Sequence, residues 1–316
     1  MGDTILSQPQ FYVMCTVGSI AVRQIFRNVS WFQLTRTQLR ESSPFQDCSP
    51  SQTKVLKGKL TVHVPQLNRK LLKMTHYQYA DLSKMIDHSL LNPTLTVEQL
   101  EAGIQLAIAY DVGSVCILPY YHKRCVELLA GTTVAPSSTV GFPHGGNTTR
   151  TKLIEAEQLI DDGCLELDMV SNISAVLSGN WKMVENEIHA IVKLSHAAKR
   201  RVKVIFENCY LKDEQKIQLC KICCQVGADW IKTSTGYGTG GATLEDLQLM
   251  LDNVQFPVQV KAAGGIRDCD ALIKVRDMGV TRVGSSKTAE ILDEARRRLE
   301  MAPIGPIKAA PVGASY

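Results

Sequence analysis

The sequence lacks any apolar run of the roughly 20 residues that span a bilayer. The best candidate, Phe11 to Val22, is short, ends at Arg23 and has no basic residue ahead of it, which also argues against a secretory signal. A cluster of Lys and Arg with interleaved aromatic residues, as a nucleic-acid-binding surface needs, is missing too. We therefore expect neither a membrane nor a nucleic acid as a partner.

Patterns for disulfides and metals are also missing. The ten cysteines are scattered along 316 residues without the framework of a small disulfide-rich domain, which is typical of free thiols in a reducing compartment. Cys220, Cys223 and Cys224 form a C-x-x-C-C cluster, but no second ligand pair accompanies it, and the histidines lack ligand spacing. We interpret the cluster as a helix face of small apolar residues and predict no metal site.

Acidic residues are scarce at the start of the chain. Residues 1–73 contain ten Lys or Arg but only three Asp or Glu, whereas the remainder is slightly acidic. Two interpretations stand: an organelle-targeting peptide, which favours Arg and Ser and avoids acids, or a stretch upstream of a true start at Met74. Residues 1–75 are predicted to be a disordered extension. The expected location is the cytoplasm, or a mitochondrion or plastid if the segment is a transit peptide.

From Asp81 onward, short β-branched runs alternate with longer helical stretches. Eight strands are predicted, at residues 84–89, 114–118, 138–142, 165–170, 202–207, 230–234, 258–262 and 282–284. Eight helices are predicted, at residues 97–110, 123–129, 149–162, 181–199, 213–226, 244–251, 269–278 and 288–298. Thr96 and Asp268 stand where helix caps belong, and Gly163, Gly227 and Gly279 follow helices.

Strict alternation of strands and helices predicts a parallel sheet. Eight units match an α/β fold of the (β/α)8 class, the TIM barrel, over residues 76–302. An open doubly wound sheet is the alternative, but the G-x-G-x-x-G turn that it favours after the first strand is absent. Residues 303–316, rich in Pro, Ala and Gly, are predicted to be a flexible tail.

Charged residues inside apolar strand runs are the first candidates for chemistry, because a barrel enzyme has its active site at the carboxyl ends of its strands. In the fourth strand, Leu165, Leu167 and Met169 share one face, and Glu166 and Asp168 share the other. Carboxylates that face a barrel interior are unfavourable unless they are paired. Asp168 is therefore a candidate catalytic residue, with an internal salt bridge as the structural alternative.

Two lysines lie inside consecutive strands. Lys232 is in the sixth strand and Lys261 in the seventh, and neighbouring strands are about 4.8 Å apart. A like charge and desolvation both lower the pKa of a lysine, which favours the neutral amine that attacks a carbonyl. An ion-pair partner would explain one buried lysine, but it explains two at matching positions less well.

Glycine-rich turns follow the last three strands. Gly236–Gly241 comes after the sixth strand, Ala263–Gly265 after the seventh, and Gly284–Ser286 after the eighth, directly before a helix. Loops after strands seven and eight, together with a helix N-terminus, form the usual phosphate site of a barrel. Ordinary tight turns are the alternative interpretation.

Five segments make the sequence resemble the deoxyribose-phosphate aldolase family, the DeoC-type class I aldolases, over about residues 81–299. They are Asp87-His88-Ser89-Leu90-Leu91, Gly141-Phe142-Pro143-His144-Gly145, Glu166-Leu167-Asp168-Met169-Val170, Lys232-Thr233-Ser234-Thr235-Gly236 and Lys261-Ala262-Ala263-Gly264-Gly265-Ile266-Arg267. The resemblance implies reversible cleavage of 2-deoxy-D-ribose 5-phosphate to glyceraldehyde 3-phosphate and acetaldehyde. It implies no metal or other cofactor, because a lysine imine is the electron sink.

The resemblance also implies a role for each matching residue. Lys232 corresponds to the Schiff-base lysine, Lys261 to the lysine that lowers its pKa and transfers protons, and Asp168 to the carboxylate that acts through water at the acetaldehyde methyl carbon. The residues expected to bind substrate or phosphate are Thr235, Gly236, Gly264, Gly265 and Ser286, with Cys116 near the aldehyde and the terminal Tyr316 matching a tyrosine tail of some members.

Some positions depart from the family pattern. Lys287 and Thr288 stand where small residues are usual, Ser89 replaces a threonine, and Ser174 replaces a frequent glycine. Two other functions remain as alternatives: a different phosphate-handling barrel enzyme, such as an isomerase or a transaldolase-like enzyme, and a non-catalytic descendant that binds a sugar phosphate or a partner protein. The oligomeric state does not follow from the sequence pattern, and the resemblance implies a monomer or a homodimer.

Overall fold

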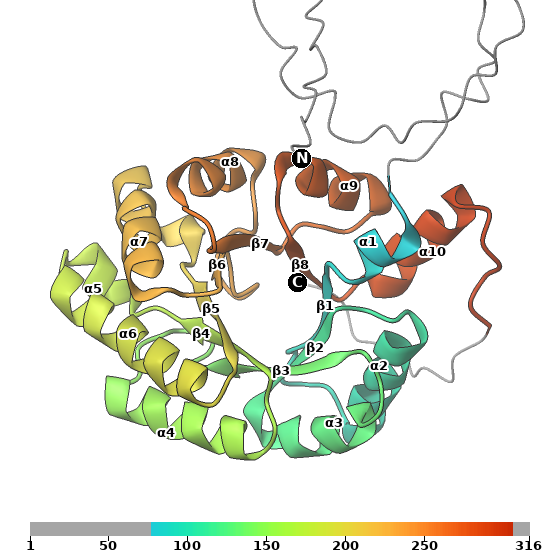
Figure 1. Cartoon of the computed structure of the whole chain (residues 1–316), viewed down its shortest axis with the longest axis horizontal. Helices are drawn as coiled ribbons and strands as arrows, with labels where there is room; N and C mark the ends of the chain where they lie inside the picture. Colours follow the sequence, from blue (N-terminus) through green and yellow to red (C-terminus); the bar gives the residue numbers. More distant parts are fainter. Residues whose placement is uncertain (1–76, 306–316) are drawn as a thin grey trace, which may run out of the picture. The chain divides into compact units, whose positions relative to one another are not determined.

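The computed structural model describes residues 77–305 of the chain. The predictions for residues 1–75, for Met74 and for Tyr316 lie outside the described residues. Eight parallel strands close into a barrel in sequence order, and the helices surround this inner ring (Figure 1). The prediction of a TIM barrel is therefore confirmed.

The strands lie where the alternating pattern predicts them. They are β1 Ile86–Leu90, β2 Ser114–Ile117, β3 Ala135–Val140, β4 Glu166–Val170, β5 Arg201–Ile205, β6 Trp230–Lys232, β7 Gln259–Ala263 and β8 Arg282–Ser285. Strand β3 begins at Ala135, earlier than predicted. Pro136 argues against a strand in the sequence, but a proline can stand near the start of one. Strand β6 ends earlier than predicted, at Lys232, and an irregular loop follows it.

Helices lie on the outside of the barrel (Figure 1); α1 precedes β1, α10 follows β8, and the others connect consecutive strands. They are α1 Tyr79–Ser83, α2 Val97–Ala109, α3 His122–Leu129, α4 Thr149–Asp161, α5 Ile173–Leu177, α6 Trp181–Ala197, α7 Asp213–Val226, α8 Leu244–Asn253, α9 Cys269–Met278 and α10 Thr288–Arg298. The caps form as predicted: the Thr96 side chain accepts from the Gln99 N–H, and Gly279 ends α9 in the left-handed conformation. Helices α1 and α5 were not predicted, because five residues are too few to show a period.

The two faces of each strand have different surroundings. Leu167 and Met169 of β4 belong to the apolar core beneath the helices, while Glu166 and Asp168 lie fully buried on the other face, inside the barrel. This confirms the predicted alternation. The barrel interior is thus lined by charged groups, whereas most TIM barrels fill it with branched apolar side chains.

The cysteine cluster on α7 lies against the core. Cys220 and Cys223 are fully buried in the core, and Cys224 is partly buried and packs against the same core. These positions confirm the interpretation of a helix face of small apolar residues. Within residues 77–305, no helix combines the length and the hydrophobicity of a membrane span.

Candidate active site

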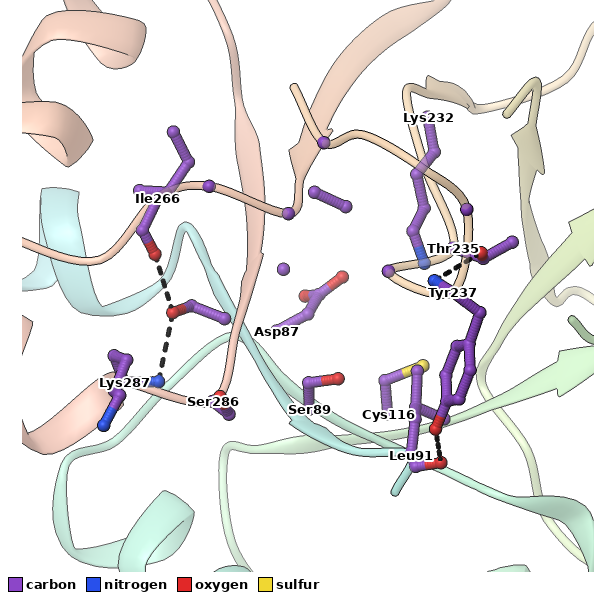
Figure 2. A pocket seen from close by; sticks show the side chains of 18 of the residues that line it. Asp87, Ser89, Leu91, Cys116, Lys232, Thr235, Tyr237, Ile266, Ser286 and Lys287 are labelled. Carbon is purple, nitrogen blue, oxygen red and sulfur yellow. Dashed lines mark hydrogen bonds between the residues drawn. The ribbon is translucent and has the colours of Figure 1, made fainter. Parts of the chain in front are cut away.

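A pocket of about 360 Å³ opens at the carboxyl ends of the strands. Its floor includes Asp87, Cys116, Lys232 and Lys261, and its rim is formed by the loops after β6, β7 and β8. Figure 2 shows Lys232 reaching from its strand into this space, toward Asp87 and Cys116. The pocket therefore lies where barrel enzymes have their active sites.

Asp168 is the centre of the charged cluster below the pocket. The Nζ atoms of Lys232 and Lys261 each lie 2.8 Å from the same carboxylate oxygen, Oδ2 of Asp168. The two lysines are register partners on β6 and β7. The structure thus brings together the three residues that the sequence pointed to for chemistry, and it connects both amines through one oxygen atom.

The pKa values in this cluster follow from burial and from these ion pairs. Burial alone would raise the pKa of Asp168, but Lys203, Lys232 and Lys261 outweigh it and hold that pKa well below its usual range. Asp168 is therefore an ionised carboxylate in the substrate-free site.

The two lysines shift in opposite directions. Burial lowers the pKa of Lys232, but the attraction of Asp168 outweighs it, so the net pKa lies above the ordinary value. Burial also lowers the pKa of Lys261, and Asp168 and Asp87 offset this only in part. The expectation of a lowered pKa at Lys232 is therefore wrong for the substrate-free site. Lys261 is the lysine that loses its proton more easily.

A third lysine was missed from the sequence. Lys203 on β5 lies fully buried, with its Nζ 2.8 Å from Oδ1 of Asp168 and 2.7 Å from Oε2 of Glu166. Burial lowers its pKa, but the surrounding carboxylates raise it above the ordinary value. The signal that could have found it is the one that pointed to Lys232, a charged residue inside an apolar strand.

An arginine closes the cluster on the side of β1. Nε of Arg282 lies 2.8 Å from Oδ1 of Asp87, and its Nη2 lies 2.7 Å from Oε2 of Glu166. Asp87 also accepts from Lys261. Trp230 packs beneath, with the Arg282 guanidinium 5.3 Å from its ring centroid. This network fixes Lys261 from both sides, through Asp168 and through Asp87.

The glycine-rich turns form the opposite end of the pocket. Gly236, Gly264 and Gly265 have φ values of +91°, +74° and +93°, which L side chains rarely adopt. All three line the pocket together with Thr235 and Ser286. The N-terminus of α10 lies beside them, so backbone N–H groups and a helix end are available to an anion.

Lys287 and Thr288 play different parts in this region. Lys287 lines the pocket, and its Nζ lies 2.9 Å from Oε1 of Glu290. Thr288 is fully buried, with its Oγ1 2.8 Å from Nδ1 of His88 on β1. Thr288 therefore joins α10 to the barrel, and of these two residues Lys287 is the one that adds a charge to the anion-binding end.

Cys116 and Ser89 lie side by side on β2 and β1, where they are register partners that both line the pocket. The Cys116 side chain is almost fully buried. Burial, together with the negative charge of Asp168, raises the pKa of its thiol. The thiol is therefore protonated at neutral pH. The group of at least three His, Cys, Asp or Glu side chains that a metal ion would need is not found among residues 77–305.

Comparison with known proteins adds three findings. Residues 82–285 match the model of the DeoC/LacD family aldolases. A deoxyribose-phosphate aldolase from Rhodopirellula baltica is 62% identical over 231 residues, which cover 73% of this chain and 96% of the relative. One from Thermococcus gammatolerans is 42% identical, over 68% of this chain and 97% of that protein.

The fold also matches a solved structure. The tetrameric deoxyribose phosphate aldolase from Aeropyrum pernix superposes with a TM-score of 0.65 at 30% sequence identity, over 69% of this chain and 92% of that one. The family model covers the barrel from the end of α1 to the end of β8, and it includes all the candidate site residues within 77–305 except Ser286.

Proposed function

This chain belongs to the DeoC/LacD family of aldolases and acts as a deoxyribose-phosphate aldolase, and we propose that Lys232 forms the imine through which it works. The reaction is the reversible cleavage of 2-deoxy-D-ribose 5-phosphate to glyceraldehyde 3-phosphate and acetaldehyde. The observation that carries the proposal is the pair of lysine amines on one oxygen of Asp168, below a glycine-lined anion pocket.

Lys232 must be neutral to attack the aldehyde, although Asp168 favours its charged form. Lys261 has a lowered pKa and contacts the same Asp168 oxygen. The lowered pKa favours the neutral form of Lys261, and neutral Lys261 can take up the proton that Lys232 gives up through Asp168. Lys232 then attacks carbon 1 of the open-chain sugar, and loss of water gives a protonated imine.

The imine then accepts the electrons of the bond that breaks. Asp168, acting as a base through a water molecule, takes the proton from the 3-hydroxyl, which cleaves the bond between carbons 2 and 3 and releases glyceraldehyde 3-phosphate. The electron pair moves into the imine and forms an enamine. Asp168, through a water molecule, returns a proton to carbon 2, and hydrolysis releases acetaldehyde. This chemistry needs no metal, because the protonated imine is the electron sink.

The phosphate is assigned to the glycine-rich end of the pocket. Gly236, Gly264 and Gly265 let backbone N–H groups approach it, Ser286 adds a hydroxyl beside the α10 N-terminus, and Lys287 adds a positive charge. Cys116 and Thr235 lie nearer Lys232 and border the space for the sugar carbons (Figure 2).

Trapping with borohydride tests the imine. Acetaldehyde and borohydride should leave a reduced two-carbon adduct on Lys232, detected by peptide mass spectrometry. Lys232→Arg should carry no adduct and should lose about 10³-fold or more in kcat. Lys193→Arg, which changes an exposed lysine on α6, is the matched control and should label like the wild type. Full labelling of the Lys232 variant would refute the assignment.

The same protein preparations separate the alternative functions. An isomerase would still convert sugar phosphates after loss of both Lys232 and Lys261. A non-catalytic descendant would bind 2-deoxyribose 5-phosphate without producing acetaldehyde.

We also propose that the chain forms a homodimer and works in the cytoplasm. Self-association is supported by the relative from Aeropyrum pernix, which is tetrameric. A mass of a single chain, measured by light scattering, would contradict the dimer. Fluorescence of the tagged full chain confined to an organelle would contradict the cytoplasmic location.

A further inference from the structure

Glu207 is a buried acid that the proposed reaction does not use. It follows β5, the residue is 2% exposed, and its backbone has φ +59° and ψ +63°. Residues other than glycine rarely adopt this left-handed conformation, and they keep it only where the surroundings impose it. The position of this carboxylate therefore needs a physical explanation.

The carboxylate of Glu207 faces the loop that follows Lys232. Its Oε1 accepts from the Thr235 backbone N–H at 3.2 Å, and its Oε2 accepts from the Thr235 hydroxyl. The same loop packs directly on it at Gly238, where an added Cβ would lie 3.0 Å from Cδ of Glu207. Glu207 thus holds the first turn of the loop by polar contacts and the second by close packing.

The contacts continue from Thr235 across the mouth of the pocket. Oγ1 of Thr235 accepts from the Tyr237 N–H at 3.0 Å, and the Tyr237 hydroxyl donates to the Leu91 carbonyl at 2.5 Å (Figure 2). The Tyr237 ring also meets Phe142 edge-on, with 5.4 Å between the ring centroids. One chain of contacts therefore runs from Glu207 to the loops after β1 and β3.

We propose that Glu207 is a positioning residue for substrate phosphate, acting through Thr235. Its carboxylate fixes the loop at residues 235–241, so that the N–H groups around Gly236 face the anion and Tyr237 forms the adjacent wall. This inference rests on the proposed function, because it takes the glycine-rich end of the pocket as the phosphate site.

Kinetics with two substrates test this role. Glu207→Ala should raise the KM for 2-deoxyribose 5-phosphate about tenfold, as expected for loss of one charged hydrogen-bonding partner, while kcat changes less than about threefold. The kcat/KM for 2-deoxyribose, which has no phosphate, should change little. Labelling of Lys232 by acetaldehyde and borohydride should remain that of the wild type.

Three further variants sharpen the test. Glu207→Gln keeps an oxygen acceptor for Thr235, so its KM should lie between those of the wild type and Glu207→Ala. Glu207→Gly suits the left-handed backbone, so it should fold at least as well as Glu207→Ala and still show the raised KM. Glu214→Ala removes an exposed acid from α7 and should behave like the wild type.

The outcomes distinguish this inference from the proposed function. A wild-type enzyme that cleaves 2-deoxyribose 5-phosphate, with unchanged KM in Glu207→Gly and Glu207→Ala, would overturn the role of Glu207 alone. An equal fall in kcat/KM for 2-deoxyribose 5-phosphate and for 2-deoxyribose would overturn it too, because it would indicate a general structural effect. A wild-type enzyme that neither cleaves this sugar nor labels at Lys232 would overturn the proposed function itself.

Discussion

Inside the barrel, buried cations outnumber buried carboxylates. The carboxylates belong to Asp87, Glu166 and Asp168, and the cations to Lys203, Lys232, Lys261 and Arg282. Each carboxylate contacts at least two of these cations, so all three remain ionised. Because positive charge is in excess, one of the buried lysines should lose its proton more easily than the others. The lowered pKa of Lys261 identifies that group.

Lys203→Met tests how far this network depends on a residue outside the predicted site. The substitution leaves Asp168 and Glu166 buried with one cation fewer, so the free energy of unfolding should fall by about 3–5 kcal/mol. Urea unfolding measures it. Lys193→Met, at an exposed position on α6, should stay within about 0.5 kcal/mol of the wild type. Equal stability of both variants would contradict the account of the network.

At the scale of elements, one buried ion pair joins two helices to the barrel. Lys152 on α4 and Glu187 on α6 are fully buried, with 2.9 Å between Nζ and Oε2. Lys152 Nζ also donates to the Val170 carbonyl at the end of β4, at 2.8 Å. The pair therefore sets α4 and α6 against the strand that carries Asp168.

Removing one partner of this ion pair should destabilise the fold more than replacing both partners with apolar residues. Lys152→Met leaves the Glu187 carboxylate buried without its cationic partner, which should lower the free energy of unfolding by about 3–5 kcal/mol. The double variant Lys152→Met/Glu187→Leu should recover most of that loss, because no unpaired charge remains. A double-mutant cycle by urea unfolding measures the coupling, and simple additivity of the two single losses would contradict the prediction.

Most elements could be predicted from the sequence, because their signals are local. Thr96 and Asp268 cap helices with side chains only three residues from the N–H groups that they accept from. Two features were missed because their local signals are weak. Helix α5 is too short to show a period, and the first residues of β3 include Pro136, which argues against a strand.

At the scale of the whole molecule, two buried histidines link stability to pH. His88 and His122 are fully buried, and burial lowers the pKa of each to about 4. Their ordinary pKa of about 6.5 applies in the unfolded chain. Between those values the unfolded chain binds more protons than the folded protein, so stability is complete above pH 6.5 and falls as the pH drops toward 4.

The double variant His88→Asn/His122→Asn should remove this pH dependence. Between pH 7 and pH 4, the free energy of unfolding of the wild type should fall by up to about 3 kcal/mol per histidine more than that of the variant. Urea unfolding of both proteins at pH 7, 5.5 and 4.5 gives the difference, in which the contributions of the carboxylates cancel. Parallel pH curves for the two proteins would contradict the prediction.

The sequence by itself determined the barrel and the residues that meet in it. Alternation of apolar and polar residues within each strand predicted that Asp168 faces inward, and the spacing of two consecutive strands predicted that Lys232 and Lys261 are neighbours. These patterns are readable because a strand has a period of two and because consecutive parallel strands pair.

Only the tertiary structure decided how these groups affect one another. Closure of the barrel brings Asp87 of β1 against Lys261 of β7, 174 residues away, and places Lys203 on the other oxygen of Asp168. It also showed that Lys261, rather than Lys232, has the lowered pKa, and that Glu207 supports the loop after β6. Charge interactions depend on distances between atoms far apart in sequence, and no local period encodes those distances.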